Sequence, residues 1–572
     1  MFKSLSDENR FRGFGLILLL GVLVCWGALS IAAALRQGTW ADEASYIVKS
    51  WWYISGLVRP YTAEDATWYQ PLIFYALGAW QWVFGHDIGS SRLLSVLITA
   101  TNIVLLVLLL CRFGCTIWPV TFAIVTFALT EDSIFYFSSA TPYSYAVCLQ
   151  LVALHLLLGM RKKVSLAAAM LLGVILTMIY LLRINLVSFI ALSLGVAWVR
   201  AGKDRWLVYF CSAAIFLVTW SLLALLWGRQ FSYITIWLPG VTDWLVQAGV
   251  LPKLYPHVGL SRQMLLDSSY SSLILNLLGR AFSLGMLRDW IAAHHILPLL
   301  VAFWATILGL YKNTLNRGWI VLFALSYWGM LIFHHLGAQS YCPICIQAYA
   351  NYFNYLAALA GGLSLHSMLR RNPDSCIQRG TVVSIILIAL ALAAAQSWSL
   401  SGVNKLPSIR NRTDSLPDEV RQASSALSSL LPPGSRVEFV GRDPRIHLAL
   451  ARSDIRFPPI SLALTSYYRR LNDNLSPEQT LETIEELRQL TMWTDEIAKE
   501  WIQDNGDWIV LQREPVDYAF PWLIWSPAAI LIKNGLQNCF EQVAESSFAT
   551  FVPPLSFALY RRTKRGNICL GG

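Results

Sequence analysis

The chain has 572 residues, of which 56% are hydrophobic and only 14% are charged, a composition typical of integral membrane proteins. The formal net charge is +10, but the basic residues occur in short clusters between apolar runs. This distribution is typical of the cytoplasmic loops of membrane proteins, so we exclude nucleic acid as a partner.

The acidic residues divide the chain into two parts. Of the 34 Asp and Glu residues, 20 lie after position 400, which leaves 14 before it. We therefore predict a membrane module of spanning helices over 1–399 and an external soluble α/β domain over 400–572.

The first apolar run, residues 13–35, is long enough to span a bilayer, and no small-residue cleavage site follows it. We expect a retained first helix. Asp42 and Glu43 come soon after it and open an amphipathic stretch whose aromatic residues at 51–53 suit the headgroup zone. Asp42 is either a functional carboxylate or the N-cap of a helix over 43–55, because Asp is a favoured capping residue.

Ten further apolar runs are candidates for spanning helices. They cover residues 92–111, 114–130, 142–160, 164–182, 184–199, 206–227, 291–311, 318–336, 346–369 and 380–398. The run 67–85 is short and contains Gln70, Pro71 and Gln81, so we expect it to lie along the membrane interface without crossing.

Four basic clusters set the orientation. They lie at 161–163, 200–205, 312–317 and 370–379, and all fall on the cytoplasmic side if the N-terminus is cytoplasmic and 67–85 does not cross. The sequence thus predicts an α-helical polytopic membrane protein with about 11 spanning helices, additional interfacial helices and a C-terminal α/β domain on the outer side.

In this topology, ten of the 14 acidic residues before position 400 lie on the outer side. Two acidic pairs, Asp42-Glu43 and Glu131-Asp132, abut the ends of predicted helices. Ionisable groups at membrane depth are costly and usually mark function, so we expect the chemistry at the outer face. The second pair could also simply terminate a span.

The histidine and cysteine pairs give little indication of a metal. Adjacent histidines at 294–295 and 334–335 point about 100° apart on a helix, so such a pair seldom binds one ion. Cys342 and Cys345 lack the second pair that a zinc site requires. The sequence shows no clear ligand cluster for a divalent cation, and a cofactor stays unknown.

The C-terminal part has the pattern of an α/β domain. Residues 435–441 and 507–513 read as buried strands, and a capping box at 476–479 opens a helix to about residue 504. Residues 548–562 predict one or two final strands. With no phosphate loop, nucleophile elbow or metal cluster, packing, acceptor guidance or partner binding is favoured over catalysis.

Four motifs follow one another along the first part of the membrane module. They are "Asp-Glu-x-x-Tyr" at Asp42, Glu43 and Tyr46, "Gln-Pro-Leu" at 70–72, "FG…R" at Phe84, Gly85 and Arg92, and "FYFSSATPYS" at 135–144. Their order resembles the GT-C superfamily of polyprenyl-phosphate-sugar-dependent glycosyltransferases. The likeness is greatest to the branch of the bacterial protein O-mannosyltransferases and the lipid A aminoarabinose transferase.

The chain departs from that family pattern at two positions. Gln70 and Thr141 replace basic residues that could meet a lipid phosphate. Arg183, at an outer turn, and Arg262, in the long loop 228–290, are our candidates to replace them, although Arg183 could also only snorkel to the interface.

The resemblance implies a role for each matching residue. Asp42 is the expected general base, with Asp132 as the second catalytic candidate. The expected substrate-binding residues are Glu43, Tyr46, Gln70 and Tyr143 from the motifs, together with our own candidates Arg183 and Arg262.

The function that the resemblance implies is an inverting glycosyltransferase in the bacterial inner membrane. It would move a sugar from a polyprenyl-phosphate donor to a hydroxyl of a glycan, lipid or protein acceptor on the outer side. The alternatives are an oligosaccharide ligase or polymerase with diphosphate-linked donors, a catalytically inactive scaffold, and a transporter or flippase. A transporter would favour charges at the bilayer midplane, which the sequence does not show.

Overall fold

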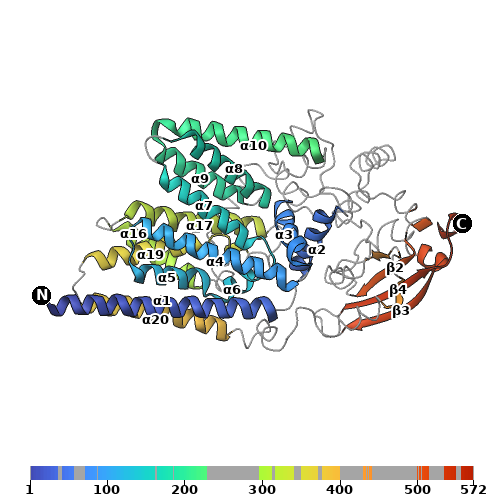
Figure 1. Cartoon of the computed structure of the whole chain (residues 1–572), viewed down its shortest axis with the longest axis horizontal. Coiled ribbons are helices and arrows are strands. Elements are labelled where there is room, and N and C mark those ends of the chain that lie inside the picture. Colours follow the sequence, from blue (N-terminus) through green and yellow to red (C-terminus); the bar gives the residue numbers. More distant parts are fainter. Residues whose placement is uncertain are drawn as a thin grey trace. The chain divides into compact units, whose positions relative to one another are not determined.

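A computed structural model gives the fold of a large part of the chain (Figure 1). It describes residues 2–36, 41–56, 71–86, 88–160, 164–183, 186–227, 296–311, 316–339, 349–371, 376–399, 429–432, 435, 437–440, 499, 502–503, 506–514, 534–548 and 555–570. The chain divides into two compact units. The first comprises Met1–Gln37, Asp87–Thr219 and Gln263–Thr413, and the second Gly38–His86, Trp220–Arg262 and Asp414–Gly572. The predicted domain boundary near residue 400 lies outside the described residues and stays a prediction.

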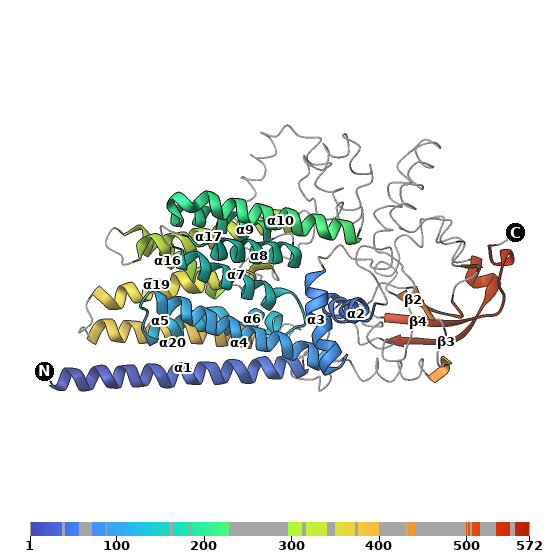
Figure 2. The same cartoon turned by 45° about the horizontal axis from the view of Figure 1, so that its top comes forward.

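The first unit is a bundle of apolar helices that run side by side (Figures 1 and 2). Each of the eleven predicted spans overlaps a helix of the structure. These helices are α1 (Phe2–Arg36), α4 (Ile88–Arg112), α5 (Ile117–Ala128), α7 (Tyr143–Gly159), α8 (Leu166–Leu182), α9 (Val187–Arg200), α10 (Arg205–Trp227, in this unit up to Thr219), α16 (Ile296–Leu310), α17 (Arg317–Gln339), α19 (Asn354–Arg371) and α20 (Cys376–Ser399).

Three helical segments in the described part are long and apolar enough to cross a membrane. They are Gly13–Leu35, Ile88–Arg112 and Gly202–Leu223. The pair formed by α5 and the short α6 (Glu131–Phe137), bent by 68°, would make a fourth. The remaining apolar helices are shorter. These segments support a membrane location, whereas the count of eleven spans stays a prediction.

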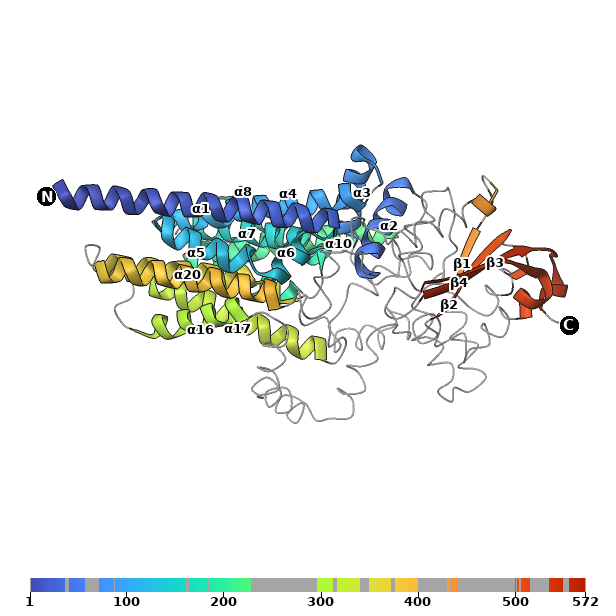
Figure 3. The same ribbon diagram turned by 90° about the horizontal axis from the view of Figure 1, so that it is seen from below.

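Close packing against α19 organises the bundle. Every residue over 351–367 is buried, and two glycines of this helix allow neighbouring helices to approach. A Cβ atom on Gly361 would collide with Val301 of α16, and one on Gly362 would lie 3.2 Å from the carbonyl oxygen of Pro119 in α5. Small residues at such contacts are typical of membrane helix packing. Figure 3 shows α5 between α1 and α20.

Arginine side chains cap helix C-termini in the bundle. Nη1 of Arg112 donates to the carbonyl of His155 at 2.7 Å, and Nη2 of Arg200 donates to that of Leu158 at 3.0 Å, both in the last turn of α7. Nε of Arg317 does the same for the end of α16, at 2.9 Å from the carbonyl of Gly309. Arg200 and Arg317 each satisfy a carbonyl that has no partner within its own helix, and all three cations complement a helix dipole.

The second unit contains a four-stranded sheet of order β1-β2-β4-β3, formed by β1 (Val437–Val440), β2 (Trp508–Glu514), β4 (Leu555–Arg562) and β3 (Phe540–Phe548). The predicted strands at 435–441 and 507–513 are confirmed as β1 and β2. These two strands pair in parallel, and the other pairs are antiparallel.

Parallel pairing needs a crossover connection, usually a helix. The predicted helix that begins at 476 lies in that connection, mostly outside the described residues, but Lys499 and residues 502–503 near its end are helical. Consecutive buried residues in β2, over 508–510, mean that both faces of this strand are covered, as in an α/β layer arrangement.

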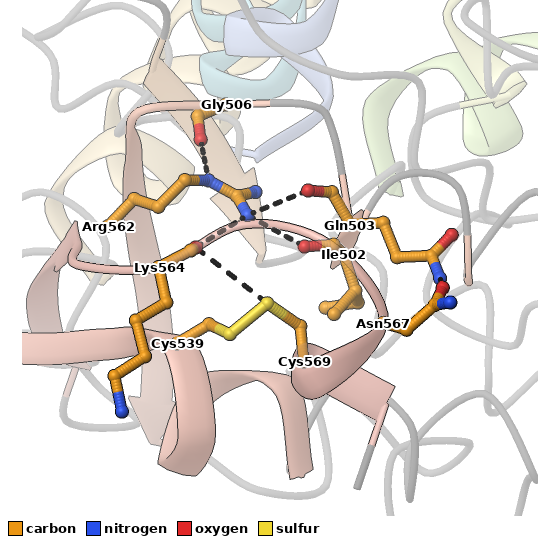
Figure 4. Close-up of a disulfide and its surroundings, with 8 residues drawn as sticks. All are labelled: Ile502, Gln503, Gly506, Cys539, Arg562, Lys564, Asn567 and Cys569. Carbon is orange, nitrogen blue, oxygen red and sulfur yellow. Dashed lines mark hydrogen bonds between the residues drawn. A yellow bond between two sulfur atoms is a disulfide. The ribbon is translucent and has the colours of Figure 1, made fainter. Parts of the chain in front are cut away.

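The end of β4 is anchored by Arg562 (Figure 4). Its guanidinium donates to the carbonyl of Gly506 at 2.6 Å and to that of Ile502 at 2.7 Å, and it lies 4.4 Å from the ring centroid of Phe540. Beside it, a disulfide joins Cys539 to Cys569. The spacing of the ten cysteines in the sequence does not predict this pairing.

We expect replacement of Cys539 by serine to destabilise the sheet of the second unit. The disulfide closes a sequence separation of 30 residues, for which chain entropy suggests about 3 to 4 kcal/mol. Thermal unfolding of the full chain, with protease resistance of the C-terminal region as a second readout, measures the effect. Cys25→Ser, at an exposed thiol of α1, is the matched control. Identical unfolding of both variants would contradict a stabilising disulfide.

Candidate functional site

The first acidic pair lies at the start of α2 (Ala41–Ser55), which packs against α3 (Leu72–Phe84) as a helical hairpin within the second unit. Nε2 of the buried Gln81 donates to the carbonyl of Ile47 at 3.1 Å, and Gly78 lets the backbone of Ser50 approach α3. At 13 residues α3 is about 20 Å long, which is shorter than an apolar core of about 30 Å. Several helices that coincide with predicted spans, such as α5 with 12 residues, are equally short, so the interfacial position of 67–85 stays a prediction.

Glu43 and Tyr46 lie on the face of α2 that is buried. Glu43 is 0% exposed and Tyr46 is 2% exposed, and the Tyr46 ring stacks on Phe74 of α3 at 5.3 Å. Glu43 is therefore no ordinary solvated helix residue. A buried carboxylate requires compensation by charges or hydrogen bonds, which is how functional carboxylates are often held.

Asp42 is the second residue of α2, and its side chain lies outside what the structure describes. The helix begins at Ala41, two residues before the start expected at 43. Asp42 therefore stands inside the first turn, where the helix dipole favours a negative charge. Its role as the base stays a prediction.

The second acidic pair opens α6 at a sharp bend of the chain. Glu131 and Asp132 are half-buried in its first turn, and the Thr130 side chain caps the helix by accepting from the backbone N–H of Ser133 at 3.3 Å. The pair therefore follows the end of the apolar helix α5, in line with the interpretation that it terminates a span, and it also begins α6.

Arg183 and Tyr143, two predicted site residues of the first unit, both contact Tyr352, which was not among the predicted site residues. Nε of Arg183, at the C-cap of α8, donates to the hydroxyl of Tyr352 at 3.0 Å. The ring of Tyr143, the first residue of α7, lies 4.6 Å from the Tyr352 ring and 5.1 Å from that of Tyr136. Arg183 and Tyr143 therefore belong to one cluster.

The α6 helix joins this cluster through a hydrogen bond to the turn before α19. The hydroxyl of Ser133, next to Asp132, donates to Oδ1 of Asn351 at 3.5 Å. Nδ2 of Asn354 donates to the same oxygen at 3.3 Å. Asp132, Tyr143 and Arg183 are thus held on elements that meet around residues 351–354. In the sequence, the concentration of Tyr and Asn residues over 349–355, inside an apolar run, is the feature that could have indicated a functional role for this segment.

One face of α4 holds the backbone around the cluster. The hydroxyl of Thr99 donates to the carbonyl of Phe137 at the end of α6, at 3.3 Å. Nδ2 of Asn102 donates to the carbonyl of Ser144 in the first turn of α7, at 2.8 Å. The fully buried Arg92 donates through Nη1 to a carbonyl in the last turn of α1, at 3.2 Å.

Thr141, which stands where the family pattern carries a cation, is buried in the turn between α6 and α7. Its hydroxyl donates to the carbonyl of Tyr136 at 3.3 Å, so it stabilises that turn. Gln70 and Arg262 lie outside the described residues. Within the described ranges, no three His, Cys, Asp or Glu side chains gather closely enough to hold a metal ion.

No protein-family model and no curated protein sequence matches the chain. Among solved structures, it is similar to the oligosaccharyltransferase of Archaeoglobus fulgidus in complex with zinc and sulfate, at 12% identity and a TM-score of 0.45, over 92% of this chain and 72% of that one. It is also similar to ArnT of Cupriavidus metallidurans, both in the apo state and bound to undecaprenyl phosphate. Each of these two structures has 12% identity and a TM-score of 0.41, over 96% of this chain and 98% of that one.

We expect Gly78→Ala to separate α2 from α3, because the added Cβ would collide with the backbone carbonyl of Ser50. Overpacking of this kind costs about 1 to 3 kcal/mol, and it would displace the helix that carries the first acidic pair. Thermal unfolding and activity measure the effect. Gly329→Ala, which meets nothing within 4 Å in α17, is the control and should be neutral or stabilising. Equal behaviour of the two variants would contradict the tight α2–α3 contact.

Proposed function

We propose that the chain is an inverting glycosyltransferase of the bacterial inner membrane. It transfers a sugar from a polyprenyl-phosphate donor to an acceptor hydroxyl on the outer side. The observation that carries the proposal is the cluster of Arg183, Tyr143 and Tyr352 at the ends of apolar helices, beside the helix of Asp132. A guanidinium at the end of an apolar bundle suits the phosphate of a membrane lipid.

The reaction is a single displacement at the anomeric carbon. The acceptor oxygen forms the new bond while the bond from carbon to the phosphate oxygen breaks, which inverts the centre. Asp42 takes the proton of the acceptor hydroxyl as general base, and the lipid phosphate leaves with the bonding electrons. Because the leaving group is already a phosphate, it needs a cation such as Arg183 and no proton.

The first acidic pair supports a role for α2 in this chemistry. The complete burial of Glu43, one residue after Asp42, ties the start of the helix firmly to its surroundings. Asp132, half-buried at the start of α6, is the alternative base.

Two observations support the external position of the second unit's sheet. Disulfides persist in oxidising compartments such as the bacterial periplasm, and the sheet carries the Cys539–Cys569 bond. The distribution of basic clusters among the loops is an independent property, and it also favours the outer side for the C-terminal domain. The external domain would then lie on the side where acceptors are available.

We expect reporter fusions after Lys163 and after Gly572 to report opposite sides of the membrane. The first follows a basic cluster assigned to the cytoplasm, and the second follows the disulfide-bonded domain. An alkaline phosphatase and fluorescent protein pair at each site measures this. The same side for both fusions would overturn the proposed orientation.

We expect Asp42→Asn to reduce transfer by about 10²- to 10⁴-fold, the usual contribution of a general base. Release of polyprenyl phosphate from a panel of polyprenyl-phosphate sugars is the measurement, and binding of undecaprenyl phosphate should stay near normal. Asp132→Asn is the matched comparison. If Asp42→Asn keeps more than about a tenth of the activity while Asp132→Asn does not, the base is Asp132.

A further inference from the structure

The hydroxyl of Tyr352 is the acceptor for Nε of Arg183, at 3.0 Å. Arg183 comes from the end of α8, where its backbone is extended (φ −157°, ψ 115°), and is half-buried. Tyr352 comes from the turn before α19, 169 positions further along the chain. The contact therefore joins two helices that the sequence does not place together.

The Tyr352 ring is held rigidly. It is 0% exposed, lies 4.6 Å from the ring of Tyr143 and 6.1 Å from that of Tyr349. Its backbone N–H donates to the carbonyl of Tyr349 at 3.1 Å, and the neighbouring Asn351 is bonded to α6 and α19. The hydroxyl oxygen is thus an acceptor in a fixed position.

A fixed acceptor on Nε defines the plane of a guanidinium. The group is planar and carries five N–H donors in a fork, of which the edge formed by the two terminal nitrogens matches a phosphate. An arginine side chain is otherwise long and flexible, and ordering it at the moment of binding weakens affinity. Preorganised donors avoid that loss.

We infer that Tyr352 is a positioning residue that orients the guanidinium of Arg183 toward the phosphate of the lipid donor. The inference rests on the proposed function, because it deepens the role of Arg183 there. Tyr352 acts through Arg183 and not on the sugar. Removal of its hydroxyl should therefore weaken lipid-phosphate binding only when the arginine is present.

A double-mutant cycle on the full chain tests this. Binding of undecaprenyl phosphate in detergent is titrated for the unaltered chain, Tyr352→Phe, Arg183→Lys and the double variant. Phenylalanine keeps the ring against Tyr143 and removes only the hydroxyl. Tyr355→Phe is the matched control, a fully buried tyrosine one turn further along α19 whose hydroxyl has no hydrogen-bond partner in the described structure.

We expect Tyr352→Phe to raise the Kd about 3- to 10-fold in the arginine background and to have no effect in the lysine background. Tyr355→Phe should bind like the unaltered chain. An equal effect of Tyr352→Phe in both backgrounds would mean a purely structural role and overturn the inference. So would normal binding by Tyr352→Phe while Arg183→Lys binds weakly. Failure of the unaltered chain to bind undecaprenyl phosphate would instead overturn the proposed function.

Discussion

The described bundle depends on side chains that donate hydrogen bonds to backbone carbonyls of neighbouring helices, several of which lie at a helix end and have no partner within their own helix. Arg92, Thr99 and Asn102 lie on one face of α4 and donate to the last turn of α1, the end of α6 and the first turn of α7. Arginines such as Arg200 and Arg317 donate to carbonyls near the ends of α7 and α16. Where the carbonyl is buried and lies at a helix end, as for the acceptors of Arg92 and Thr99, loss of the donor costs about 1 to 3 kcal/mol.

The same constraint explains where the candidate site can form. Ionisable groups are tolerated where helices begin and end, because backbone dipoles and polar side chains are concentrated there. Glu131 and Asp132 occupy a first turn, Arg183 a C-cap, and Tyr143 the first residue of a helix. A lipid with a charged head and an apolar tail would meet the bundle at the same kind of boundary, with its phosphate beside the guanidinium.

Much of this architecture could be predicted from the sequence, and the exceptions have physical reasons. Long apolar runs located the helices, and short apolar runs between turn residues located β1 and β2. The edge strand β3 was missed in large part because its exposed residues, among them Glu541, Gln542 and Glu545, hide any apolar alternation. The Cys539–Cys569 bond could not be inferred from ten scattered cysteines. Tyr352 was missed because hydropathy averages a polar segment into the apolar span around it.

The proposed function requires this chain to recognise a lipid monophosphate at its outer helix ends. Native mass spectrometry of the purified protein with equimolar undecaprenyl phosphate, undecaprenyl diphosphate and phosphatidylglycerol tests it most directly. We expect retention of the monophosphate in preference to the other two, with the preference lost in Arg183→Lys. Retention of the diphosphate instead would favour a ligase or polymerase, and no selective retention of any of the three would contradict recognition of a lipid monophosphate.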